Sequence, residues 1–318
     1  MLLSRVAENL YWAARYLEPA EDTARIVLQH TNVIIDMPDS VSLGRNPLLA
    51  ILGDPETDGM VNETEIVNYL ACDTSNPSSI VASVVAAREN LRTTREVLPR
   101  AAWQATNDLY LQVGDRCGEA VPRFTRTKYL SHIVGESQRI VGILAGTMSR
   151  DAAYSMLRLG RNIERADMTT RVLDVRAGSL MGGDGAFDDI QWVGVLQSLS
   201  ALQMYRRATR SPLDGHSVVR FCLQSREFPR SVAHCLREVT HCMSVLPARA
   251  EVSRACDIAT EQLAGLALHD ISGWHLHFLT DALQQAIGDV HGAIAEGTFG
   301  LRSVSHSRRC WFGDVAST

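Results

Sequence analysis

The sequence predicts an all-α protein, a multi-helix bundle. Apolar residues recur at helical spacing along most of the 318 residues, and no segment shows the sustained polar–apolar alternation of a half-buried strand. The composition is rich in Ala, Leu, Val and Arg and only 6% aromatic, which favours helices over a β-sandwich. Prolines, glycines and capping residues divide the chain into segments of helix length.

The first helix is expected to begin at Ser4, a capping residue, and to run to about residue 36 with Pro19 inside it. Residues 37–59 are rich in Pro and Gly and are expected to be irregular. Further helices are expected at 64–71, from Pro77 to about Val97, from Pro99 onward, at 126–148, and at 149–177 with Ser149 as the cap. After a glycine-rich loop at 178–185, helices are expected at 189–209, 215–224, 229–245, 248–266 and 272–296, followed by an irregular tail.

An internal repeat organises the chain. Residues 15–27 read RYLEPAEDTARIV and residues 161–173 read RNIERADMTTRVL, with five identities at one offset of 146 residues (161 minus 15). A second pair of segments, 66–80 and 218–232, matches at an offset of 152 residues (218 minus 66). We therefore predict two diverged tandem copies of one helical unit, residues 1–148 and 149–297, integrated in one domain, with an irregular tail at 298–318.

The first of the two matching stretches forms a ladder of charges. On a helical wheel Arg15, Glu18, Glu21, Asp22 and Arg25 lie on one face, opposite the apolar residues. One interpretation is an ordinary solvated face with ion pairs along the helix, Arg15 with Glu18 at i,i+3 and Glu21 with Arg25 at i,i+4. Such pairs contribute about 0.2–0.5 kcal/mol each on an exposed helix.

The second copy repeats the ladder with Arg161, Glu164, Asp167 and Arg171, and adds Arg165. A solvated face has no reason to keep the same charges at the same places in two diverged copies. Arginine is also the cation suited to bidentate, partly buried contacts. The ladders therefore favour a buried polar lattice between the two long helices, which is either structural or a ligand site.

A third helix carries Arg88, Arg92 and Arg95 on one face at i, i+4 and i+7. These guanidinium groups are expected to meet the ladder carboxylates, or to receive a phosphate or carboxylate ligand. A solvated helix is the alternative.

Several function classes are disfavoured by the composition. A net charge of −5 argues against a nucleic-acid partner, and no apolar run reaches the roughly 20 residues that span a bilayer. The amino terminus lacks the features of a signal peptide, and the seven cysteines form no C-x-x-C pair, so we expect a cytoplasmic protein with reduced thiols. No metal site and no cofactor are expected, because the histidine spacings do not suit zinc and no phosphate-binding glycine loop is present.

At the two ladders the chain resembles the bacterial alpha-E proteins, a family named for a predicted all-helical domain with a recurring Glu-Arg motif. The matching stretches are MLLSRVAENLYW through Arg25, NPSSI through ARENLR, and RLGRNIERAD through Asp174, with PRSV at 229–232 and AIAE at 293–296. Together they cover nearly the whole chain. The sequence departs from the pattern in the first copy, where Pro19 rather than Arg follows Glu18.

The resemblance implies a place in a peptide- or amide-bond-forming system, because such proteins are encoded beside, or fused to, circularly permuted ATP-grasp proteins. The chain is expected to be a helical partner subunit that binds the ligase or its peptide or amino-acid substrate. The alternative is an enzyme that binds an acidic or peptidic substrate and transfers an acyl group. In that alternative Glu164 and Glu18 are the catalytic residues, and the binding residues are Arg15, Glu21, Arg25, Arg88, Arg92, Arg161, Arg165, Asp167 and Arg171.

Overall fold

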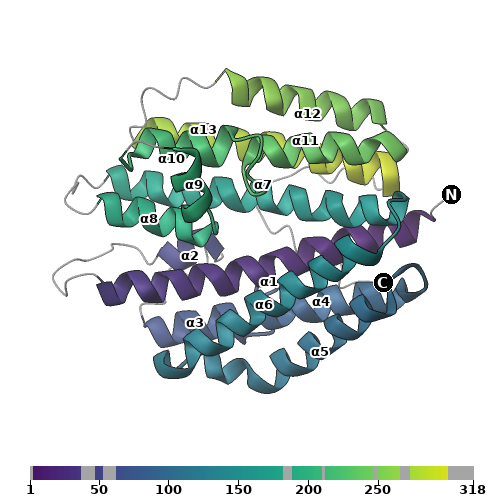
Figure 1. The fold of residues 1–318 in the computed structure, drawn as a ribbon, viewed down its shortest axis with the longest axis horizontal. Coiled ribbons are helices and arrows are strands. Elements are labelled where there is room, and N and C mark those ends of the chain that lie inside the picture. The colour runs from purple at the N-terminus through teal and green to yellow at the C-terminus, as the bar shows by residue number, and fades with distance from the viewer. Residues whose placement is uncertain are drawn as a thin grey trace.

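The fold is an all-helical bundle, as the sequence predicts (Figure 1). In a computed structural model, residues 3–36, 47–52, 62–181, 188–209, 212–246, 249–265 and 273–299 are described. The α-helices among them are α1 (Ser4–Asp36), α2 (Pro47–Leu52), α3 (Glu63–Ala71), α4 (Ile80–Thr93), α5 (Arg100–Arg116), α6 (Arg123–Thr147), α7 (Ala152–Met181), α8 (Asp188–Ser198), α9 (Leu202–Ala208), α10 (Gly215–Gln224), α11 (Val232–Cys242), α12 (Arg249–Ala264) and α13 (Gly273–Ile294). Within these ranges no residue is in a strand.

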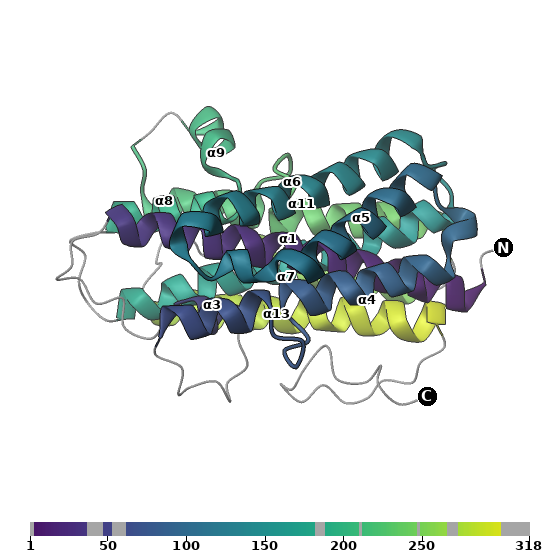
Figure 2. The ribbon, with the colours of Figure 1, turned by 90° about the horizontal axis from the view of Figure 1, so that it is seen from below.

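The two long helices α1 and α7 lie side by side at the centre of the bundle (Figures 1 and 2). Helices α4 and α6 pack against α1, whereas α11 and α13 pack against α7. Every residue of α1 from 13 to 27 is buried, including its charged residues. The ladder of α1 therefore lies in the interior of the molecule.

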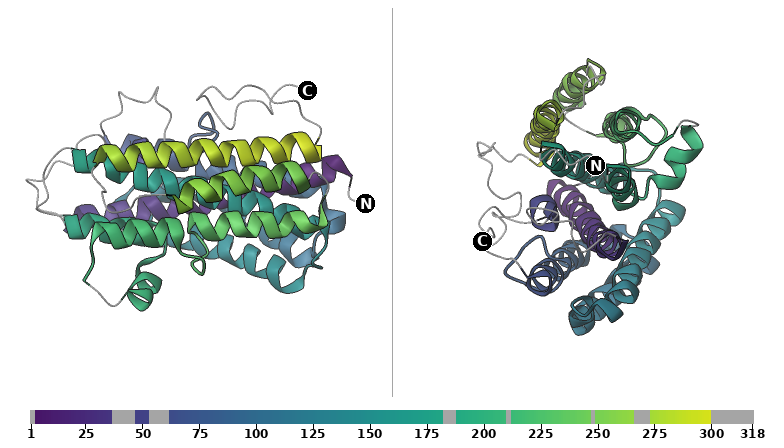
Figure 3. Two further views of the ribbon diagram at one scale, coloured as in Figure 1. Left: turned by 90° about the horizontal axis from the view of Figure 1, so that it is seen from above. Right: turned by 90° about the vertical axis from the view of Figure 1, so that its left-hand side faces the viewer.

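The outer helices are arranged alike around the two central ones. Helix α5 packs between α4 and α6 below α1, and α12 packs against α11 and α13 above α7 (Figure 1). The end view in Figure 3 shows the two groups on opposite sides of the α1–α7 pair. This arrangement is what two copies of one unit would give, although common descent of the halves and the unit boundaries stay predictions.

Short polar side chains begin several helices, as the capping rules predict. Ser79 starts α4 and accepts a hydrogen bond from the backbone N–H of Ala82, and Ser231 starts α11 in the same way. At α7 the expected cap was wrong: the helix begins at Ala152, three residues after Ser149. The carboxylate of Asp151 accepts a hydrogen bond from the N–H of Tyr154 instead, because it lies closer to the first free amides.

Other expected boundaries also change. The expected helix at 189–209 is broken into α8 and α9 at Ser200, whose φ of 53° lies outside the helical region. Residues 47–52, expected to be irregular, form α2, and residues 178–181 continue α7. Thr298, expected to begin an irregular tail, lies in a π-helical turn that spans Ala295–Phe299. The rest of the expected irregular segments lies outside the described residues.

Helices α1 and α7 approach each other closely at Gly160. A Cβ atom at this position would stand 2.2 Å from the carbonyl oxygen of Tyr11. Only a residue without a side chain allows this contact between the two backbones. The glycine thus sets the distance at which the two ladders meet.

None of the described helices is both long and apolar enough to cross a membrane. The six described cysteines are free thiols, four of them buried, and Cys310 lies outside the described residues.

Candidate functional site

The two ladders are buried against each other in the α1–α7 contact. Glu18 and Arg15 are 2% exposed, and Glu164 and Asp167 are 4% exposed. The solvated-face alternative is therefore wrong for both ladders. Among the ladder residues of α7, Arg161, Arg165 and Arg171 are half-buried.

The ion pairs cross from one ladder to the other. Arg15 Nε and Nη2 donate to Glu164 Oε2 at 2.9 and 2.7 Å, and Arg165 Nε donates to Glu18 Oε1 at 2.6 Å. The expected pair between Arg15 and Glu18 is wrong, since the Arg15 side chain extends to the neighbouring helix instead of along its own. The crossed pairs bind α1 to α7 at two points.

Three further pairs lie within single helices. Arg25 bonds Glu21, as expected at i,i+4, and Asp22 Oδ1 at 2.8 Å. In α7, Arg171 Nε donates to Asp167 Oδ2 at 2.8 Å, which is the equivalent i,i+4 pair. These pairs hold the ends of the two ladders.

A residue outside the ladders, Arg230, completes the lattice. Its guanidinium bonds Glu18 Oε1 at 2.7 Å, Asp22 Oδ1 at 2.8 Å and Glu21 Oε1 at 3.0 Å. Arg230 precedes Ser231, the cap of α11, and its carbonyl oxygen accepts from Thr169 of α7 at 2.7 Å. Sequence reasoning missed this residue, although it stands in the second repeated segment, where it replaces Ser78 of the first copy.

The arginines of α4 do not join the lattice, which corrects the expectation for this helix. Arg88 faces α5, where it bonds Asn107 at 3.3 Å and stacks over Tyr110 at 4.8 Å. Arg92 is exposed and pairs with Glu89 on its own helix at 2.5 Å. Both side chains lie on the face of α4 that turns away from α1, since the apolar residues of α4 occupy the inner face.

The crossed pairs centre on two consecutive residues, Glu164 and Arg165, of which the first binds Arg15 and the second binds Glu18. A family model described as "a predicted alpha-helical domain with a conserved ER motif" matches residues 2–299. The chain belongs to the Alpha-E family. No curated protein and no solved structure matches the chain.

The two glutamates of this Alpha-E chain occupy equivalent ladder positions but different surroundings. Glu18 receives Arg165 and Arg230, whereas the hydrogen bonds of Glu164 come from Arg15 alone. Burial raises the pKa of both carboxyls, but at Glu18 the two arginines outweigh it and hold the pKa at about 2. At Glu164 burial prevails over Arg15, with help from Asp167, and the pKa rises to about 7.

Two substitutions between the copies produce this difference. The counterpart of Arg165 is Pro19, and the counterpart of Arg230 is Ser78. Glu164 therefore lacks both arginines that compensate Glu18. Helix α1 continues through Pro19 without ending.

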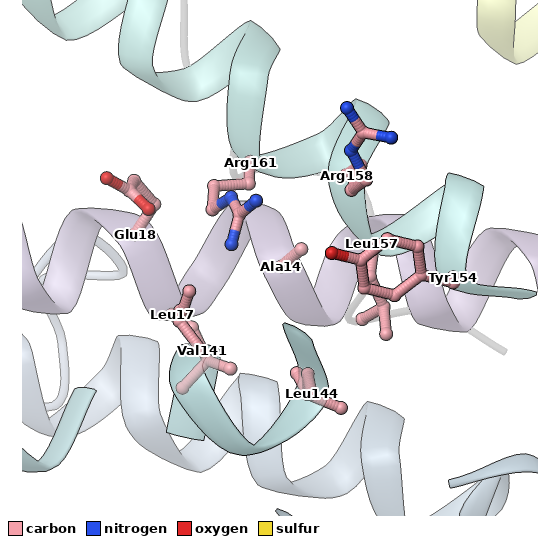
Figure 4. A pocket seen from close by; sticks show the side chains of 9 residues that line it. All are labelled: Ala14, Leu17, Glu18, Val141, Leu144, Tyr154, Leu157, Arg158 and Arg161. Atoms are coloured by element: carbon pink, nitrogen blue, oxygen red, sulfur yellow. The ribbon is translucent and has the colours of Figure 1, made fainter. Parts of the chain in front are cut away.

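A small pocket lies next to the lattice, between α1, α6 and α7 (Figure 4). Arg161 and Arg158 line it from α7, opposite apolar side chains of α1 and α6. The Arg161 Nε is buried and has no hydrogen-bond partner among the described residues. Burial and the neighbouring Arg165 lower the pKa of Arg161. The cavity measures about 20 Å³, which is room for one water molecule.

Metal-ligand geometry is missing from the described part of the chain, where no three His, Cys, Asp or Glu side chains gather in a metal-binding arrangement. His277 instead pairs with Asp174 at 2.6 Å, and His291 lies 3.2 Å from Arg15 Nη1 and 2.6 Å from the Tyr11 hydroxyl. These histidines are hydrogen-bonding partners of α1 and α7.

Proposed function

We propose that this Alpha-E protein is a helical partner subunit of an ATP-grasp-type peptide or amide ligase system, and that it acts in the cytoplasm. In this proposal it binds the ligase or the peptide substrate of the ligase and does not catalyse the reaction itself. A circularly permuted ATP-grasp protein is the proposed partner, on the strength of the family resemblance.

The observation that carries this proposal is that the ladders close on each other. Arg15, Glu164, Arg165 and Glu18 engage one another, so most of their charge is neutralised within the fold. Small-molecule sites usually have volumes of about 300–1,000 Å³. The cavities described beside the lattice measure about 20 and 30 Å³, which suits a structural network better than a substrate site.

An exposed aromatic pair supports an interaction role. Trp274 and Phe278 lie one turn apart near the start of α13 and are 66% and 69% exposed. Large apolar side chains that remain exposed on one face often mark a contact surface for another protein. We assign these two residues to the contact with the ligase.

Co-purification with the neighbouring ATP-grasp protein tests this proposal, followed by mass spectrometry of the products made from ATP and amino acids. The wild-type chain is expected to form a complex and to be required for product. The double variant Trp274→Ser/Phe278→Ser should lose the complex, whereas Phe124→Ser, at another exposed aromatic residue on α6, should keep it. Product formation at an unchanged rate without the chain would overturn the proposal.

One observation favours the alternative, in which the chain is an enzyme or substrate-binding subunit of the same system. Arg161 is a buried cation with an unused Nε, and Glu164 has a pKa of about 7, which suits a general base. In this alternative Arg161 holds a carboxylate of an acidic or peptidic substrate. Glu164 takes the proton from the amine that attacks the acyl group.

The Glu164→Gln variant separates the two functions. If the residue is the base, the reconstituted ligase system should lose its activity while the melting temperature changes little. The partner-subunit proposal expects the variant to keep its activity when the fold is intact. Arg161→Gln serves as the companion variant, which should raise the KM for an acidic substrate only in the enzyme alternative.

A further inference from the structure

Two similar turns precede α4 and α11, and they differ at one functional position. Ser79 and Ser231 are the caps, each accepting a hydrogen bond from the N–H three residues later. The residue before the cap is Ser78 in the first turn and Arg230 in the second. Arg230 extends to the three carboxylates of α1, while Ser78 lines a cavity beside the carboxylates of α7.

The cavity lies where a guanidinium group stands in the other half of the lattice. Glu164 and Asp167 line it from α7, and Pro19 lines it in place of the arginine found at residue 165. Ile51 and Leu52 of α2 form an apolar wall. Arg15 and Arg171, which pair with the two carboxylates, also line it. The space thus combines two ion-paired carboxylates with an apolar side, and its volume is about 30 Å³.

Each of these carboxylates has an oxygen to spare. Arg15 engages Oε2 of Glu164, and Arg171 engages Oδ2 of Asp167. Glu164 Oε1 and Asp167 Oδ1 accept no hydrogen bond from any described residue. Neither oxygen is among the fully buried polar atoms that lack a partner, so both stay accessible from the cavity that their residues line.

The net charges of the two clusters indicate which sign of charge a ligand of the cavity would carry. In the α1 cluster the carboxylates of Glu18, Glu21 and Asp22 face the guanidinium groups of Arg25, Arg161, Arg165 and Arg230, which leaves one positive charge in excess (four minus three). In the α7 cluster Glu164 and Asp167 face Arg15 and Arg171, which leaves none (two minus two). One added cation would give the second cluster the balance of the first.

We propose that the cavity beside Glu164 binds a primary ammonium group, with Glu164 Oε1 and Asp167 Oδ1 as acceptors and Ile51 and Leu52 in contact with the adjoining carbon. The volume admits two water-sized groups, which matches an ammonium nitrogen and one carbon better than a whole guanidinium. A lysine side chain and a peptide amino terminus share this chemistry. The proposal does not rest on the ligase partnership, because it uses only the geometry of the cavity.

The proposal makes binding pH-dependent, since the ligand needs an ionised Glu164. Burial raises the pKa of this carboxyl to about 7, so its charged form gains population between pH 6 and pH 8, while alkylammonium probes stay protonated. The charged or titratable groups that face it are Arg15, Asp167 and Arg171, with His291 behind Arg15. The lining residues of α2 and of the turn before α4 are uncharged.

The test measures binding of small amines to the full-length chain by calorimetry and by thermal shift. Methylammonium is the minimal probe, n-butylammonium stands for a lysine side chain, and glycinamide stands for a peptide amino terminus. Saturable binding of methylammonium is expected, tighter at pH 8 than at pH 6. The better of the two longer probes identifies the source of the ammonium group. Acetate should not bind at this site.

Three variants make the test specific. Glu164→Gln, which is nearly isosteric, should weaken methylammonium binding about tenfold or more because it removes a charged hydrogen bond. Ser78→Lys should supply a tethered ammonium group, raise the melting temperature and abolish binding of the probe. Ser78→Met fills a similar volume without charge, so it should abolish binding without the rise in melting temperature.

The proposal is overturned if methylammonium shows no saturable binding to the wild-type chain, or if acetate binds in its place. It is also overturned if Glu164→Gln binds the probe as tightly as wild type. These results leave the ligase partnership untouched, since that is measured by complex formation. Conversely, a missing ligase complex does not affect the amine titration.

Discussion

At the scale of single residues, the same amino acid at matched ladder positions has opposite electrostatic properties. Glu18 is held ionised by Arg165 and Arg230, whereas burial favours the neutral form of Glu164. The carboxylates are equally buried, so the difference comes from the number of arginines within reach. Pro19 and Ser78 are the substitutions that remove those arginines from Glu164.

Matched glutamine variants should reveal this contrast. At pH 7.5 Glu18→Gln is expected to lower the free energy of unfolding by about 3 kcal/mol, because it removes a buried carboxylate whose pKa is far below its usual range. Glu164→Gln should cost less, since the fold already favours the neutral form of this carboxyl. Urea denaturation of the two variants makes the comparison, and equal losses would contradict it.

Glu18 and Glu164 should also contribute differently to the pH dependence of stability. The pKa of Glu18 is lowered in the folded state. Its contribution to the free energy of unfolding is therefore complete above pH 4.5 and is lost as the pH falls toward 2. The pKa of Glu164 is raised in the folded state. Its contribution to the free energy of unfolding is therefore present below pH 4.5 and is lost as the pH rises to about 7. Glu164→Gln should therefore flatten the profile between pH 4.5 and 7 and leave the acid limb below pH 4.5 unchanged.

At the scale of the elements, the close contact of α1 and α7 depends on Gly160. The helices themselves were predictable from periodicity and caps, because those signals are local. The break at Ser200 and the start of α7 at Ala152 were not, since several capping residues stand near each boundary and the tertiary packing selects among them. The contact distance at Gly160 could not be predicted from the sequence either, because it depends on the backbone of a helix far away in the chain.

Gly160→Ala tests this contact. The new methyl group would meet the Tyr11 carbonyl oxygen, so α1 and α7 must separate and the ladder pairs must stretch, at a cost of about 1–3 kcal/mol. Gly142→Ala on α6 is the control: nothing lies near its Cβ position, and helix propensity predicts a gain of up to about 1 kcal/mol. Thermal denaturation measures both, and a neutral or stabilising Gly160→Ala would show that the contact is not required.

At the scale of the whole molecule, the lattice joins elements far apart in the sequence. Burial of the ladders was predictable, because two diverged copies kept the same charges. The crossing of the pairs was not, since a helical wheel compares only residues of one helix. Arg230 was not predicted for the same reason: it lies 212 positions after Glu18 (230 minus 18), and only the folded chain brings the two together.

Removal of Arg230 should therefore weaken the whole bundle rather than one part. Arg230→Met removes the cation that bonds all three buried carboxylates of α1, at an expected cost of about 3–5 kcal/mol. Arg92→Met removes an exposed pair and should leave the stability nearly unchanged. Calorimetry should show one cooperative transition shifted to lower temperature for Arg230→Met. Two separate transitions would show that the halves unfold independently.

The crossed lattice also determines which fragments of this chain would recognise each other. The cluster residues before α7 carry one negative charge in total, and those from α7 onward carry two positive charges. The first set is Glu18, Glu21, Asp22, Arg15 and Arg25, and the second is Arg161, Arg165, Arg171, Arg230, Glu164 and Asp167. In a chain cut between α6 and α7, the cluster residues of the two pieces would carry opposite charge, while those of two identical pieces would carry charge of the same sign. The opposite charges of the two sets therefore favour pairing between the two different fragments. They disfavour a swapped homodimer of either half.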